Sequence, residues 1–230
     1  HPSLRRLWSR ANFYPCPLII SIMYSKNQLM FQWLSPSFPT GSFNFSQGLE
    51  YAVSQSMVKN EADLVVWIEN NLEHGFLRND AIFLKLAYQI STDKDLDDLT
   101  ELCLAFSCSA LKLNEQVMTG DNFAKASDTQ LGLPYPIALG TAAKKHKLKI
   151  EELVPLFLQS NISNLIAAAQ RLLPLGHKRS TNILKNLFEK INEISRKVLI
   201  SGGKDLFSSC YLTDTCTLLH EEFQGKVFKS

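Results

Sequence analysis

The chain has 230 residues, of which 45% are hydrophobic and 20% are charged, an ordinary globular composition that argues against a disordered protein. Its 24 basic and 22 acidic side chains leave a formal charge of +2, so the chain has no overall field that would attract nucleic acid or an anionic membrane. The length allows one sizeable hydrophobic core, or at most two small ones.

The five cysteines favour a reducing compartment. Their number is odd and they form no C-x-x-C pair, which argues against a disulfide framework and against a tetrathiolate zinc site. Reduced, mostly buried thiols in a cytoplasmic protein are the better interpretation. The apolar runs are far shorter than the roughly 20 residues that a membrane-spanning helix needs, so no membrane contact is expected.

The first 22 residues are expected to lie outside the native fold, as a non-native or disordered extension. Arg5, Arg6 and Arg10 resemble the basic start of a secretory signal, but the apolar piece that follows is short and no small-residue cleavage site comes after it. A single domain is therefore expected over residues 23–230.

The segment 34–50 predicts a shaped loop that leads into a helix. Pro36 and Pro39 fix φ and bias the residues before them away from the helical region. Gly41 and Gly48 allow a positive φ or a close backbone approach. The segment also carries three aromatic side chains, Phe38, Phe43 and Phe45.

Helical periodicity begins at residue 60. Asn60 is a good N-cap for a helix that Gly75 should end, and Asn79 and Asp80 are expected to cap the next helix. The apolar face of the first helix is predicted to contain Leu64, Trp67, Ile68 and Leu72. A further apolar stripe, which follows a loop at residues 91–93, contains Leu96, Leu99, Leu102, Cys103 and Phe106.

The second half of the chain continues this pattern. A looser helix is expected to break near Gly120, and a proline-rich interruption at 132–136 precedes a helix over 137–145 in which Gly140 admits a close neighbour. Two longer apolar stripes follow, over 158–173 and 184–198. No sustained alternation predicts a strand. Together these patterns predict an all-α, single-domain bundle of mostly antiparallel amphipathic helices.

No catalytic or nucleotide-binding motif is complete. Gly203 and Lys204 resemble the end of a phosphate-binding loop, but Asp205 stands where Ser or Thr should follow. Ser46 sits in half of a nucleophile elbow whose leading glycine is replaced by Asn44. We therefore expect no catalytic residue.

Metal and nucleic-acid sites are equally weakly supported. His220 starts a pattern typical of zinc helices, but Gln224 replaces the second histidine. The basic run at 144–149 is followed at once by acidic residues and contains no interleaved aromatic side chain, which favours a solvated helix end. Neither a metal, a cofactor nor a nucleic-acid partner is expected.

Four ordered segments resemble the urease accessory protein F family. The first is the loop, whose pattern F-P-x-G-S-F-x-x-S-x-G-L-E is carried by Phe38, Pro39, Gly41, Ser42, Phe43, Ser46, Gly48, Leu49 and Glu50. The others are residues 111–120, 136–176 and the tail 220–230. The tail departs from the family pattern by carrying Lys226 and Lys229 where arginine is usual.

The resemblance implies an all-α homodimer with no catalytic activity of its own. It implies a scaffold that joins the D/H-type accessory protein to the G-type GTPase, in a complex that delivers nickel to apo-urease when GTP is hydrolysed. Nickel and GTP are accordingly expected to be handled by the complex and not bound by this chain.

The loop and the tail are the predicted partner-binding segments. Rings at four positions are expected to act as hydrophobic anchors, the glycines to set the backbone path, and the polar side chains to fix orientation. The full predicted set is Phe38, Pro39, Gly41, Ser42, Phe43, Phe45, Ser46, Gly48, Leu49, Glu50, His220, Glu221, Lys226, Phe228, Lys229 and Ser230, with Phe38, Phe43, Phe45 and Phe228 as the anchors.

Two other functions remain open from the sequence. A metallochaperone would bind nickel through His220 together with Cys210 or Cys216. An uncharacterised all-α enzyme would use the neighbourhood of Ser46 and Glu50, although no general base stands there in a recognisable motif.

Overall fold

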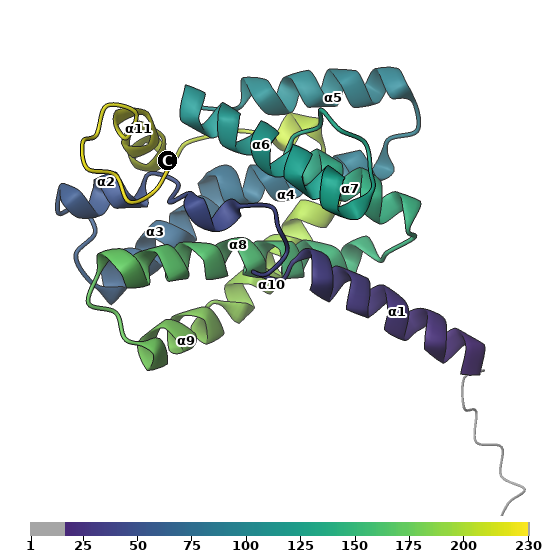
Figure 1. Cartoon of the computed structure of the whole chain (residues 1–230), viewed down its shortest axis with the longest axis horizontal. Helices are drawn as coiled ribbons and strands as arrows, with labels where there is room; N and C mark the ends of the chain where they lie inside the picture. The colour runs from purple at the N-terminus through teal and green to yellow at the C-terminus, as the bar shows by residue number, and fades with distance from the viewer. Residues whose placement is uncertain (1–16, 230) are drawn as a thin grey trace, which may run out of the picture.

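The computed structural model describes residues 17–229, with side chains from residue 25 on, and within that range it contains helices, turns and loops but no strand (Figure 1). In chain order the helices are α1 (Pro17–Trp33), η1 (Ser42–Asn44), α2 (Leu49–Ser54), α3 (Glu61–His74), α4 (Phe76–Gln89), α5 (Asp93–Ala105), α6 (Ala110–Ser127), α7 (Tyr135–Lys145), α8 (Ile150–Leu172), α9 (His177–Asn186), α10 (Phe188–Ile200), η2 (Gly203–Asp205) and α11 (Tyr211–Leu219). The all-α prediction is confirmed.

The expected extension can be located only in part. Helix α1 begins at Pro17, so residues 17–22 of the expected extension form its first turns. Residues 1–16 lie outside the described residues. The boundary at residue 22 stays a prediction.

Helix α4 is the centre of the bundle. It packs against α3, α5, α7, α8 and α10, and it buries side chains around its whole circumference, as a core helix does. Even Lys85 is buried there, and its ammonium donates to the carbonyl oxygen of Ser201 at 2.8 Å.

The N-cap expected at Asn60 is confirmed. The Asn60 side chain accepts the N–H groups of Ala62 and Asp63 at 2.9 and 3.1 Å, as expected of the N-cap of α3. The cap of α5 is Thr92, whose hydroxyl accepts the N–H of Asp95 at 3.1 Å.

The expected caps at Asn79 and Asp80 are wrong. Helix α4 begins three residues earlier, at Phe76, and both side chains serve tertiary contacts from within its second turn. The amide of Asn79 donates to the carbonyl oxygen of Phe207 at 2.8 Å, and the carboxylate of Asp80 faces Lys112.

The expected break at Gly120 is also wrong, because α6 runs unbroken from Ala110 to Ser127. The glycine is needed for packing. A Cβ at this position would meet the carbonyl oxygen of Leu133 and lie 2.9 Å from the backbone nitrogen of Tyr135, where the chain crosses α6 on its way into α7.

Other differences concern helix limits. The stripe predicted over 184–198 is divided between α9 and α10, which meet at Leu187. Helices α1 and α11 were not predicted. In Figure 1, α2 and α11 lie at one end of the bundle with the C-terminal tail beside them, while α1 projects from the other end. The two segments with the sequence motif therefore meet in space.

Gly140 gives a direct test of the packing between α4 and α7. A Cβ there would meet the carbonyl oxygen of Leu84 and lie 2.9 Å from the Cβ of Ala87. Gly140→Ala should destabilise the protein by about 1–3 kcal/mol through overpacking, although alanine is the better helix former. Urea unfolding measures this. Gly203→Ala is the control, because nothing lies within 4 Å of the added Cβ, and it should change stability little.

Candidate loop–tail interface

One carboxylate joins the loop to the tail. Glu50, in the first turn of α2, is only 4% exposed. Its Oε2 lies 2.8 Å from Nε2 of His220, and the backbone N–H groups of Val227 and Phe228 donate to Oε1 and Oε2 at 2.6 and 3.0 Å. Glu50 is thus hydrogen-bonded to both ends of the tail segment.

These contacts favour the charged form of Glu50. Burial alone would raise the pKa of this carboxyl, but the two backbone N–H groups of the tail and the imidazole of His220 hold the pKa below its ordinary value of 4.5. A lowered pKa in the folded state stabilises the folded chain above the ordinary carboxyl range, and that contribution is lost as the pH falls through the folded-state pKa. The attachment is therefore complete at neutral pH.

Gly48 lets α11 approach α2. It has a φ of +76°, and a Cβ on it would lie 2.8 Å from both the backbone nitrogen and the hydroxyl of Thr217. Both observations require glycine here. Because α11 leads directly into the tail, this close contact brings His220 to Glu50.

A second backbone contact holds the tail on the loop. The N–H of Lys229 donates to the carbonyl oxygen of Asn44 at 2.8 Å. Asn44 lies next to Gly41, whose φ is +80° and whose carbonyl oxygen accepts the Asn44 side chain at 3.2 Å. We call the surface formed by residues 41–50 and 220–229 the loop–tail surface.

Three of the four rings that were expected to act as hydrophobic anchors are buried in the free chain, and their role in partner binding stays a prediction. Phe38, Phe45 and Phe228 are buried within this chain. Phe38 packs on Phe123 with ring centroids 5.7 Å apart, and the ring of Phe228 lies under the guanidinium of Arg171 at 4.3 Å. These rings close the core beneath the loop and the tail, so they are not available to a partner in this conformation.

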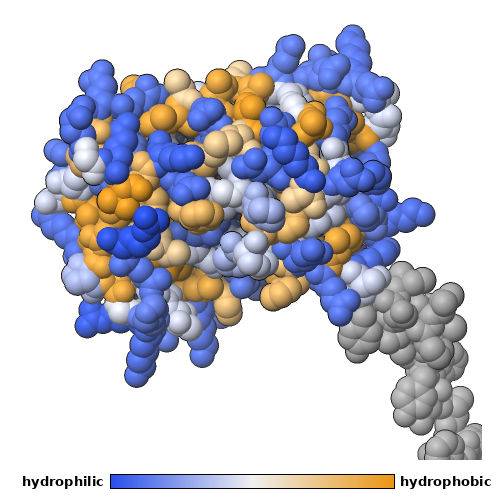
Figure 2. Space-filling model, viewed as in Figure 1, coloured by the Kyte–Doolittle hydropathy of each residue, from blue (hydrophilic) through white to orange (hydrophobic). Residues whose placement is uncertain are grey.

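Phe43 is the exposed ring of the set, at 62%, and Val227 of the tail is exposed at 57%. Sequence reasoning did not select Val227, because an isolated valine near a chain end gives no signal of exposure. Figure 2 shows hydrophobic surface among hydrophilic side chains on the left of the molecule, where Figure 1 has α2, α11 and the tail.

The remaining predicted residues divide by exposure. Pro39, Lys226 and Lys229 are exposed, whereas Gly41, Ser42 and Glu221 are half-buried. Ser46, Gly48, Leu49, Glu50 and His220 are buried. Ser230 lies outside the described residues.

The polar members of the set mostly bind this chain itself. Ser46 Oγ accepts the N–H of Glu50 at 3.3 Å, and Ser42 Oγ accepts the amide of Asn164 at 3.1 Å. Glu221 accepts the N–H of Leu111, at the start of α6, at 3.2 Å. These contacts fix the loop and tail, so their first role is structural.

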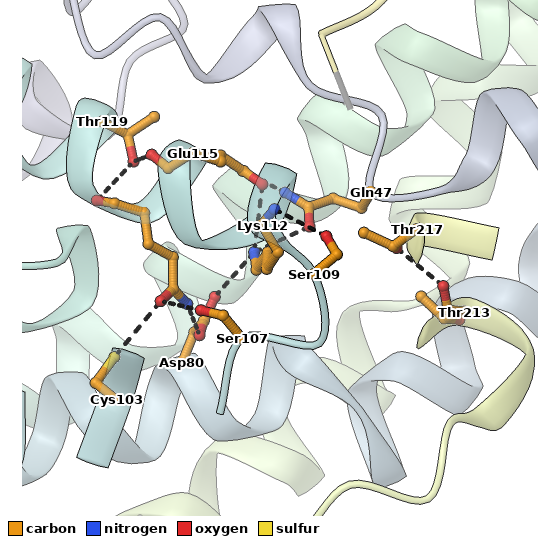
Figure 3. A network of polar contacts seen from close by, with 11 residues as sticks. Gln47, Asp80, Cys103, Ser107, Ser109, Lys112, Glu115, Thr119, Thr213 and Thr217 are labelled. Atoms are coloured by element: carbon orange, nitrogen blue, oxygen red, sulfur yellow. Dashed lines mark hydrogen bonds and ion pairs between the residues drawn. The ribbon is translucent and has the colours of Figure 1, made fainter. Parts of the chain in front are cut away.

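A buried ionic network supports the loop from below (Figure 3). The ammonium of Lys112 lies 2.9 Å from Oε1 of Gln47, 3.5 Å from Oε2 of Glu115 and 3.8 Å from Oδ2 of Asp80. Gln47 also donates to Glu115, and Gln116 donates to Asp80 at 3.2 Å. The network joins the loop to α4 and α6.

The network contains two carboxyl groups and one lysine. Burial raises the pKa of both Asp80 and Glu115, and the nearby ammonium of Lys112 only partly offsets this. Burial lowers the pKa of Lys112, but the two nearby carboxylates raise it by more. The net result is a raised pKa. Sequence reasoning noted Lys112 but missed its partners, since their spacing carries no motif.

Comparison with known proteins agrees with the motif. The family model described as UreF matches residues 58–188. The urease accessory protein UreF of Roseobacter denitrificans is 34% identical over 204 residues, covering 86% of this chain and 91% of the relative. The urease accessory protein UreF of Agrobacterium fabrum is 35% identical over 208 residues, which cover 86% of this chain and 93% of the relative. This chain belongs to the UreF family.

UreF family members are accessory proteins of urease, so this chain has an accessory role in urease maturation and is not an enzyme. Of the two alternatives, the enzyme is thereby set aside. For the metallochaperone, residues 17–229 contain no group of three or more His, Cys, Asp or Glu side chains placed to hold a metal ion. None of the helices in that range is long and apolar enough to cross a bilayer.

Glu50→Gln should loosen the tail of this UreF family member. The substitution removes the charge and one acceptor, and a hydrogen bond to a charged group contributes about 1.5–3 kcal/mol. Amide hydrogen exchange at Val227 and Phe228 should become roughly 10- to 100-fold faster, with helices α4 and α7 unchanged. Exposed Glu222→Gln is the matched control. Equal protection in both variants would contradict the role of Glu50.

Lys112→Met should be strongly destabilising, by about 3–5 kcal/mol, because it leaves two buried carboxyl groups without a cation. Asp80→Asn instead removes the surplus negative charge and keeps an oxygen for Gln116, so its stability should be equal to or above that of the wild type. Urea unfolding at pH 7 compares the two. A similar loss in both variants would show that the network depends on shape and not on charge.

Proposed function

We propose that this chain is a non-catalytic scaffold of urease maturation that bridges the D/H-type accessory protein and the G-type GTPase, so that nickel is inserted into apo-urease with GTP hydrolysis. In this proposal the metal and the nucleotide are bound by the partners, and the chain acts as a homodimer. The observation that supports it best is the loop–tail surface. In it the loop and the tail, two of the four segments that resemble the family, form one structural unit.

The surface has the composition of a protein-binding site. Phe43 and Val227 supply exposed apolar area, and the exposed side chains of Lys226 and Lys229 supply positive charge beside it. Apolar anchors with a polar rim are typical of protein interfaces. Such a surface suits a partner with an apolar pocket and acidic edges.

The surface is also ordered before binding. Glu50, the Lys112 network and the Gly48 contact with α11 fix its backbone, so a partner does not have to order the loop and the tail when it binds. Preorganisation of this kind lowers the entropic cost of association. In this proposal the partner meets one rigid surface.

A cytoplasmic location is part of the proposal. The four cysteines from residue 25 on are all free thiols, as expected in a reducing compartment.

The test is the affinity of the purified full chain for each purified accessory partner, measured by titration calorimetry. Phe43→Ala and Val227→Ala should each weaken binding of at least one partner. The Phe43→Ala change should cost about 2 kcal/mol of binding free energy, which lowers the affinity roughly 30-fold. Leu131→Ala is the control, because Leu131 is exposed at 55% outside the loop–tail surface. Unchanged affinity for both partners in both loop–tail variants would overturn the proposal for this surface.

A further inference from the structure

Helix α11 has the reverse of the usual amphipathic arrangement. Its buried residues are two threonines and a cysteine, and His220 at its C-cap is buried as well. The outward face instead carries its leucines, with Leu212 exposed at 52%, Leu218 at 50% and Leu219 at 42%. A surface helix normally turns its apolar side chains toward the core. Burial of leucine therefore does not set the rotation of α11 about its axis.

The inward face of α11 is one stripe of weakly polar side chains. Three- and four-residue spacing places them on the same side of the helix, and the stripe consists of Thr213, Cys216, Thr217 and His220. Thr217 donates to the carbonyl oxygen of Thr213 at 2.9 Å (Figure 3), and its hydroxyl and backbone nitrogen lie against Gly48. The far end of the stripe is the histidine that faces Glu50. A rotation of α11 would break these contacts together.

Asn71 of α3 holds the near end of the stripe. Its side chain is fully buried, and its Nδ2 donates to Oγ1 of Thr213 at 2.8 Å. The same amide group donates to the carbonyl oxygen of Trp67 at 2.9 Å, so the donor is fixed within its own helix. Because a hydrogen bond is directional, this contact favours one rotation of α11. Cys216 contributes less, since its thiol is a weak donor to the sulfur of Met57 at 3.8 Å.

We propose that Asn71 and Thr213 are positioning residues of the loop–tail surface. Their hydrogen bond selects the rotation of α11 that brings His220 to Glu50 and keeps the leucines of the helix outward. A buried polar pair can specify one arrangement at some cost in stability, as a buried asparagine does in coiled coils. The inference rests on the proposed function for the use of this surface, whereas its test needs only the free chain.

Amide hydrogen exchange of the full chain tests the proposal in two single variants. Asn71→Leu and Thr213→Val each remove one partner of the hydrogen bond and keep a side chain of similar size. Each should make exchange at the two tail amides that Glu50 binds at least tenfold faster, because α11 no longer holds the tail in place. Thr215→Val is the matched control, since Thr215 is exposed on the same helix, and it should leave this exchange within twofold.

The double variant Asn71→Leu/Thr213→Val separates positioning from stability. With both partners apolar, neither is left as an unpaired buried polar group, so the urea midpoint should lie above those of the two single variants. Exchange of the tail amides should nevertheless stay at least tenfold faster than in the wild type. Recovery of tail protection together with the midpoint would overturn the proposal, and so would tail exchange at the wild-type rate in both single variants.

These outcomes are distinguishable from a failure of the proposed function. If Phe43→Ala and Val227→Ala left the affinity for both partners unchanged, the function proposed for the surface would fall. Tail exchange in the Asn71 and Thr213 variants would still show whether this hydrogen bond positions α11, because no partner is present in that measurement.

Discussion

The loop–tail surface depends on the hydrogen bonds that the carboxylate of Glu50 accepts from the tail. This carboxylate accepts hydrogen bonds from two backbone N–H groups near the end of the chain and faces a buried histidine at the start of the tail. Two motifs about 170 residues apart in the sequence thereby form one surface. A neutral side chain could satisfy fewer of these donors, so the site requires an acid.

The loop is fixed from two directions. Glu50 and Gly48 hold it to the tail and to α11, while Gln47 reaches down to the network of Lys112. That network lies against α4, the central helix, so the position of the loop is tied to the core of the bundle. Helix α11 packs on the loop through Thr217.

The sequence predicted the features that depend on local chemistry. The cap at Asn60 and the close approach at Gly140 need only one side chain, or the lack of one, and both were correct. Gly120 and Asn79 were misread, because a glycine or a polar residue can end a helix or serve a distant contact, and only the tertiary structure distinguishes these roles.

The site was predicted as a set of residues but not as an arrangement. Phe38, Phe45 and Phe228 were predicted as anchors, yet a phenylalanine in a loop carries no local sign of whether its ring faces a partner or the chain's own core. The attachment of Val227 to Glu50 uses a backbone N–H, which every residue other than proline has, so no sequence pattern could have revealed it.

The central claim is that the loop and the tail bind a partner as one preformed surface. Amide hydrogen exchange of the full chain, alone and in complex with the purified accessory partners, tests it most directly. The account predicts that the hydrogen-bonded amides of Asn44, Phe45, Val227, Phe228 and Lys229 are already protected in the free chain, and that loop and tail gain further protection together on binding. Free exchange of these amides before binding, or added protection in only one of the two segments, would contradict it.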